Sequence, residues 1–113
     1  MAVTPTTAAS GSQAATIGTE HNLLNTSSAG VYQVVVDANA LANGATPDIL
    51  RLRVYSSARS GDTERLVGDF WFQGAQAQPL IELPPFVTTH ALRVTLTQTQ
   101  GTGRTYPWSA YTW

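Results

Sequence analysis

The feature that most constrains the fold is a period-two alternation of apolar and polar residues in short segments. In ILRLRVYSS, which begins at Ile49, leucine and valine alternate with arginine and tyrosine, and HALRVTLTQTQ, which begins at His90, alternates similarly. Since successive side chains of a β-strand point to opposite faces, each segment is predicted to be a strand with one buried face. The predicted inward residues are Leu50, Leu52, Val54, Leu92, Val94 and Leu96.

Further strands are predicted from Val-rich or aromatic segments between turn residues. Gly30–Ala38 is predicted to be a largely buried strand, and Ile81–Leu83 a short one ended by Pro84. Glu64–Gly74 is expected to form a hairpin with Ile49–Ser57. A second hairpin is predicted between Leu92–Thr99 and the closing segment TYPWSAYTW, in which Pro107 indicates an edge position or a bulge.

This pattern predicts one domain of the all-β class. Short strands with turn signals about every ten residues, and no convincing helix, favour an antiparallel β-sandwich that is jelly-roll-like. Residues Met1 to about Ala15 are mostly Ala, Thr, Ser, Gly, Gln and Pro with little to bury, so Met1–Ile17 is predicted to be an extended N-terminal arm. Such an arm packs either on its own domain, residues 18–113, or on a neighbouring copy.

The C-terminus is aromatic, which is unusual for a chain end. Tyr106, Trp108 and Ala110 are predicted to share one face of the last strand, and Ser109, Tyr111 and Trp113 the other. Aromatic residues on both faces indicate that both are covered, one by the core and one by a second sheet, an arm or a neighbour.

Composition excludes several kinds of function. There is no Cys, and the net charge is −1 with six basic residues, all Arg, and seven acids. Only 12% of residues are charged, against roughly 25% in ordinary domains, and the arginines form no basic stripe, so nucleic-acid binding is not expected. Low charge indicates either a chain that associates or a neutral, hydrated surface. No apolar run approaches a membrane span, and Met1–His21 lacks the pattern of a signal peptide, so no membrane or secretion address is expected.

No catalytic or metal-binding constellation is evident. The chain lacks a nucleophile elbow and a P-loop. His21, His90 and Glu20 lack metal-ligand spacing on one face, which favours two solvated loop histidines. Asp62 and Glu64 lie in a predicted turn, where acids are common. We therefore expect no enzyme, cofactor or metal.

Asp69 and the three tryptophans each allow two interpretations. Asp69 is either a functional acid or, as cross-strand pairing favours, a partner of Arg51 or Arg53. Trp71, Trp108 and Trp113 can form a sugar-stacking platform, but Trp in a small β domain more often fills a core or an interface. The sequon at Asn25 is interpreted as a chance match.

Four segments carry a resemblance to a known family: Ala29–Gln33 (AGVYQ), Asp37–Leu41 (DANAL), Leu50–Tyr55 (LRLRVY) and Gln98–Tyr111 (QTQGTGRTYPWSAY). In them the chain resembles small phage virion proteins that close on Q-T-x-G-T-G-R-x-Y/F-P-W-x-x-Y. The resemblance covers most of the chain after about Gly18 and leaves out Met1–Ile17.

The resemblance implies a capsid cement or decoration protein on the outer surface of the virion. Its implied partners are the major capsid protein and other copies of itself, as a homodimer or homotrimer, and no catalytic residue is implied. Arginine forks suit carboxylates of the capsid protein, although a solvated sheet face is the alternative for each one. The residues expected at such interfaces are Thr4, Pro5, Thr6, Ile17, Arg51, Arg53, Arg93, Arg104, Tyr111 and Trp113.

Three other functions remain open from the sequence. A glycan-binding module of a head fibre or tail needs an exposed Trp or Tyr beside Asp, Asn or Arg. A hydrolase needs a perturbed acid or His in a pocket. A tail or connector component differs from a capsid cement only in copy number.

Overall fold

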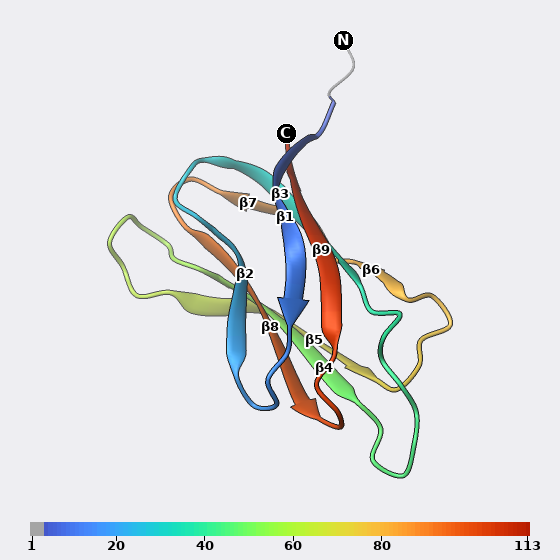
Figure 1. The fold of residues 1–113 in the computed structure, drawn as a ribbon. Helices are drawn as coiled ribbons and strands as arrows, with labels where there is room; N and C mark the ends of the chain where they lie inside the picture. Colours follow the sequence, from blue (N-terminus) through green and yellow to red (C-terminus); the bar gives the residue numbers. More distant parts are fainter. Residues whose placement is uncertain (1–3) are drawn as a thin grey trace.

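Nine strands in two antiparallel sheets account for the chain in the computed structural model, which describes residues 4–113 (Figure 1). Each segment predicted as a strand forms one, and three further strands, β1, β2 and β7, were not predicted. The strands are β1 (Thr6–Ala14), β2 (Glu20–Thr26), β3 (Gly30–Asp37), β4 (Ile49–Ser56), β5 (Arg65–Gln73), β6 (Leu80–Glu82), β7 (Phe86–Thr88), β8 (Leu92–Gln100) and β9 (Thr105–Thr112).

The two sheets pack face to face as a β-sandwich. Sheet A has the order β1-β9-β3-β6, with β7 also paired to β3, and sheet B has the order β2-β8-β4-β5. The alternating residues of β4 and β8 point between the sheets as predicted, and Leu50, Leu52 and Leu96 are fully buried there. They meet Val34, Val36 and Tyr106 from sheet A in one core cluster. The fold class is therefore all-β, with two antiparallel sheets.

The first predicted hairpin is confirmed and the second is wrong. β4 pairs with β5 through Leu50–Phe72 and Leu52–Phe70. β8 and β9, however, lie in different sheets: β8 pairs with β2 and β4, while β9 pairs with β1 and β3. The turn at 101–104 thus crosses from one sheet to the other, and a buried polar network described below holds that crossing.

The segment predicted to be an arm contributes a strand to the fold. β1 is the edge strand of sheet A and pairs with β9 from Thr6 to Ala14, with a register shift between Thr7 and Ala9. Gly11 lies opposite Trp108, and a Cβ at Gly11 would meet the indole Nε1 at 3.4 Å, an ordinary contact distance, so the ring lies directly against β1. Of the two possibilities for this segment, pairing with its own domain is the one seen, and Met1–Val3 lie outside the described residues.

Pro107 lies where it costs the sheet little. It pairs with Ser12 of β1, but it lies just beyond Trp108, the last β9 residue paired with β3. Its missing N–H therefore removes no bond to β3, although β9 is an inner strand of sheet A and not the edge strand that was predicted.

Candidate functional site

The two sheets differ sharply in charge, and this difference defines two candidate surfaces. Four of the six arginines lie on strands of sheet B, and the other two lie in loops. The strands of sheet A carry no arginine in the described chain, and their only acids are Asp37 and Glu82. One outer face is thus ionic and the other is nearly neutral. The arginines of sheet B are Arg51, Arg53, Arg65 and Arg93.

On sheet B, Arg51 is held by a carboxylate and an aromatic ring. Its Nε and Nη2 donate to the two carboxylate oxygens of Asp69 at 2.8 and 2.6 Å. Its guanidinium lies 4.5 Å from the ring centroid of Trp71. These hydrogen bonds from Arg51 hold the pKa of Asp69 below its usual range. The predicted cross-strand partner of Asp69 is therefore confirmed as Arg51.

Glu20 is the centre of a second cluster on the same face. It accepts hydrogen bonds from Thr95 Oγ1 at 2.6 Å and from Tyr55 Oη at 2.7 Å. Arg53 Nη2 lies 3.3 Å from its carboxylate. Burial raises the pKa of Glu20, but the hydrogen bonds and nearby guanidinium groups outweigh this, and the pKa is lowered. Thr95 and Thr97 point to the outer face of sheet B, as the alternation predicts, but they are buried there because the Glu20 and Arg53 side chains lie over them.

Arg93 completes the ionic face. Its guanidinium lies 4.3 Å from the ring centroid of Tyr55 and donates to Glu64 at 3.2 Å and to Asn22 at 3.1 Å. Arg51, Arg53 and Arg93 were predicted to bind carboxylates of a partner. Each already faces a carboxylate of its own chain, so docking on another protein would have to break or share these pairs.

Arg104 lies elsewhere, at the crossing between the sheets. Its Nε donates to Asp48 Oδ2 at 2.9 Å, and Asp48 is 2% exposed. The same carboxylate accepts the backbone N–H groups of Ala42 and Thr102, each at 3.0 Å. Burial raises the pKa of Asp48, but these three donors outweigh it and the pKa is lowered. Arg104 therefore ties loop 38–48 to turn 101–104 within the chain.

Gln98 extends this corner into the core. Its Oε1 accepts from Tyr106 Oη at 2.8 Å and from the Arg104 N–H at 3.1 Å, and its Nε2 donates to the Thr102 carbonyl at 2.6 Å. Burial raises the pKa of Tyr106 to about 12. All the polar atoms of Gln98 and Asp48 are bonded inside the chain, so the corner has a structural role.

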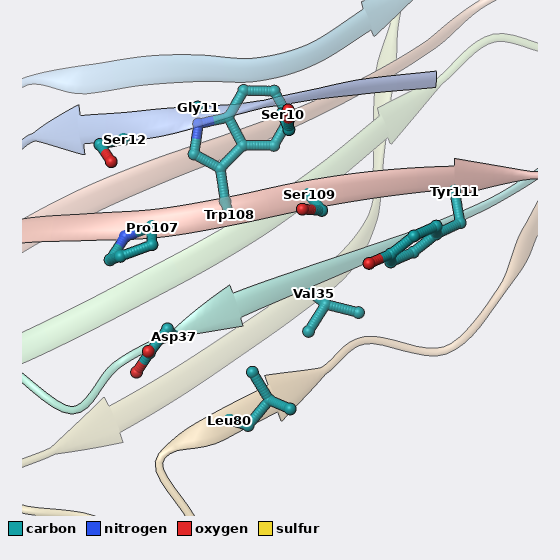
Figure 2. Close-up of a pocket in the computed structure, with 10 residues that line it drawn as sticks. All are labelled: Ser10, Gly11, Ser12, Val35, Asp37, Leu80, Pro107, Trp108, Ser109 and Tyr111. Carbon is teal, nitrogen blue, oxygen red and sulfur yellow. The ribbon is translucent and has the colours of Figure 1, made fainter. Parts of the chain in front are cut away.

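The neutral outer face of sheet A carries an open groove of about 530 Å³. Figure 2 shows its residues on β1, β9, β3 and β6, with the Trp108 ring extending over β1 at Gly11. The apolar part comes from Val35, Leu80, Pro107 and Tyr111, and serines line the β1 side. Asp37 is the only carboxylate among the lining residues, none of which is Lys, Arg or His, and its Oδ1 accepts from the Asn39 N–H. The groove is therefore a shallow apolar and hydroxyl-lined surface.

Exposed apolar side chains accompany the groove on sheet A. Leu80 is 56% exposed, Val87 75% and Trp113 43%. Val87 pairs with Val31 of β3, whose carbonyl accepts the Trp113 N–H at 3.2 Å. The aromatic C-terminus is thus divided: Tyr106 is core, Trp108 is partly buried, and Trp113 is not buried within its own chain.

The remaining predicted interface residues lie at the N-terminal side. Thr4, Pro5 and Thr6 are exposed at the start of β1, and Ile17 is 41% exposed in the turn before β2. In the structure, Tyr111 and Trp113 lie with the outer face of sheet A, and three of the predicted arginines lie on sheet B. Ile17 and Arg104 belong to neither surface. Sequence reasoning missed Leu80, whose exposure follows from its edge position on β6, and missed Asp48 and Gln98, whose burial no local pattern signals.

Histidines and acids form no metal-binding group in residues 4–113. No group of three His, Asp or Glu side chains there has metal-binding geometry. His90 Nε2 lies 3.1 Å from Ser57 Oγ, but its Nδ1 bonds Thr89 rather than a carboxylate. His21 Nε2 accepts the Thr16 N–H at 3.2 Å. These contacts fit turn and strand hydrogen bonding.

Three comparisons with known proteins were made. No protein-family profile, curated protein or solved structure matches this chain. Within the described part of the chain, no helix is long and apolar enough to cross a membrane.

Proposed function

We propose that this chain is a structural protein of a phage virion, a cement or decoration protein that binds the outer surface of the major capsid protein lattice and stabilises the head. It acts without catalysis and without a cofactor. The observation that carries the proposal beyond the sequence resemblance is the neutral outer face of sheet A, with its groove and exposed Leu80, Val87 and Trp113. Interface centres are poor in charge and rich in aromatic residues, as this face is.

The strand order supports a jelly roll as the finer description of the sandwich. Most successive strands lie in different sheets. The exceptions are the hairpin strands β4 and β5, both in sheet B, and β6 and β7, which both pair with β3 in sheet A. The N- and C-terminal strands are neighbours in sheet A, which is typical of two nested Greek keys. Such a sandwich is a rigid carrier for a flat binding face.

The proposed contact differs from the one first expected. Because Arg51, Arg53 and Arg93 are paired within the chain, carboxylate docking through sheet B contributes little net free energy. Binding through sheet A instead removes apolar surface from water and leaves serine and threonine hydroxyls to bond the partner. Many copies on a symmetric shell then stabilise it together, because binding to the assembled lattice shifts the equilibrium away from disassembly.

The copy number in purified particles tests the proposal. Quantitative mass spectrometry against the major capsid protein should give hundreds of copies in a simple ratio to it. A dozen or fewer copies would indicate a tail or connector component instead. Absence from particles would refute a virion role.

A matched pair of variants tests the face. L80D places a charge on the sheet A face, and V67D places one on β5 of sheet B at nearly the same exposure, 56% against 52%. Binding to particles that lack the protein should be lost with L80D and kept with V67D. The opposite result would assign the contact to sheet B.

A glycan-binding module is the second candidate, favoured by one observation. Trp71 is 55% exposed on β5 beside Arg51 and Asp69, which is the platform such a module needs. Glycan-array binding that is lost with W71A, while L80D binds normally, would favour this function over the first. W108A is a poor probe, because Trp108 packs against the core.

A further inference from the structure

β1 leaves one long backbone edge open. It pairs with β9 on one side, and among residues 4–113 no strand pairs with its other side. The strand is nine residues long, TTAASGSQA, with no charge and no proline. Uncharged edges of this length are ready to pair with another extended segment.

Every other edge of the two sheets carries a feature that hinders pairing. β2 has Glu20 and a register shift between Asn22 and Leu24. β5 carries Arg65 and Asp69. β6 and β7 are three residues each, and Pro79, Pro84 and Pro85 flank them. Short strands, bulges, prolines and charges are the means by which natural sheets prevent edge pairing, and β1 has only a bulge near its start.

We propose that β1 pairs antiparallel with β1 of a second copy of this chain across a two-fold axis, joining two copies of sheet A into one continuous sheet. A register centred on Ser10 uses all nine residues of each strand. The occupant is a second copy because β1 offers no charge or large side chain that would select a different partner. The same lack of charge removes repulsion between two identical strands, and an antiparallel pair of identical strands closes into a dimer.

The small side chains of β1 permit this approach. Ala9, Gly11 and Ala14 carry little or no side chain, and Ser10 and Ser12 line the groove on the outer face of sheet A. Pairing would set the neutral outer faces of two sheets edge to edge. The inference rests on the proposed function, because the family resemblance that implies a virion role also implies self-association, for which it gives the contact. It is tested on the isolated protein, so its failure is distinguishable from failure of the copy-number experiment.

Sedimentation equilibrium of the purified protein tests the proposal, with charge variants at the centre of the strand. In the expected register S10K places two like charges opposite each other, which should raise the dimer dissociation constant by about two- to fivefold. S10E should do the same. An equimolar mixture of S10K and S10E should recover dimer, because the charges are then opposite. V67K on β5 is the matched control and should dimerise like the natural chain.

Hydrogen exchange adds a readout specific to the edge. Amide protons of β1 that point away from β9 should exchange more slowly at high protein concentration than at low concentration, and S10K should abolish this difference. Thermal melting of each variant verifies that it is folded. A monomer at every concentration, or a dimer that S10K and S10E leave unchanged, overturns the proposal.

Discussion

Asp48 is the buried carboxylate at the crossing between the two sheets, and D48N tests whether that network fixes the crossing. The natural side chain accepts three hydrogen bonds: two from the backbone N–H groups of Ala42 and Thr102 and one from Arg104. An amide has the same shape but only one acceptor oxygen. If that oxygen faces Ala42 and Arg104, the NH₂ group faces the Thr102 N–H, and two donors oppose each other.

The cost follows from these contacts. A buried donor left without an acceptor costs about 1–3 kcal/mol. Loss of the charge-assisted bond to Arg104 adds about 1 kcal/mol, a figure kept low because the Arg104 side chain is 34% exposed. We expect D48N to lower the free energy of unfolding by about 3 kcal/mol, which corresponds to a fall in Tm on the order of 10 °C for a domain of this size.

Urea and thermal unfolding measure this effect, and D69N is the matched control. Asp69 also pairs with an arginine, Arg51, but its side chain is 29% exposed. We therefore expect D69N to cost less than about 1 kcal/mol. A loss below about 0.5 kcal/mol for D48N, or equal losses for both variants, would show that the buried network does not hold the crossing.

The pH dependence gives a second test of Asp48. Its pKa is lowered in the folded state, so its contribution is present above the unfolded value, about 3.9, and is lost as pH falls through the folded pKa. Acid destabilisation below about pH 4 should therefore be weaker in D48N than in the natural chain. An unchanged acid limb would contradict the assignment.

Three further predictions concern Tyr106, Gly103 and the N-terminal strand. Y106F should remove an alkaline loss of stability, because the pKa of Tyr106 is about 12 in the folded state and about 10 in the unfolded state. On the order of 2–3 kcal/mol of unfolding free energy, present below pH 10, is therefore lost from the natural chain as pH rises toward 12. Equal alkaline melting of both proteins would refute this. G103A should lower the free energy of unfolding by about 1–3 kcal/mol, because a Cβ there would lie 2.5 Å from the Ala15 carbonyl oxygen. Denaturant unfolding measures this loss. The control G11A should lose less, because a Cβ at Gly11 makes ordinary contacts. Deleting residues 1–14 should lower the free energy of unfolding by several kcal/mol, because β9 loses its partner strand. It should also shift tryptophan emission to longer wavelength, because Trp108 is uncovered. A truncated chain with unchanged Tm and emission would mean that β1 is a dispensable arm.

The difference between the two predicted hairpins shows how far local pattern reaches. In β4–β5 the alternation and the turn at Ser60–Asp62 sufficed, and the sequence limited the partner of Asp69 to Arg51 or Arg53, of which the structure has Arg51. In β8–β9 the same reasoning was wrong, because Gly101, with φ of 93°, and Gly103 mark a turn without stating which sheet the chain enters next. That choice depends on Asp48, fifty-four residues before Thr102.

The candidate surfaces show the same division. The sequence predicted that Tyr111 and Trp113 are on one face of the last strand and that Leu50, Leu52 and Val54 are core, because period two is a local property of an extended chain. It could not predict that all arginine-bearing strands collect in one sheet. Nor could it predict that Thr6–Ala14 forms a strand, since that composition becomes ordered only where β9 offers unpaired backbone groups.

By itself, the sequence determined the class of fold, most of the strands and the inward residues of β4 and β8, since these depend on neighbours along the chain. The tertiary structure alone decided which strands share a sheet, that the arginines are already paired, and that one outer face is neutral and grooved. These depend on contacts between residues far apart in sequence, where buried hydrogen bonds and side-chain packing, rather than local propensity, select the arrangement.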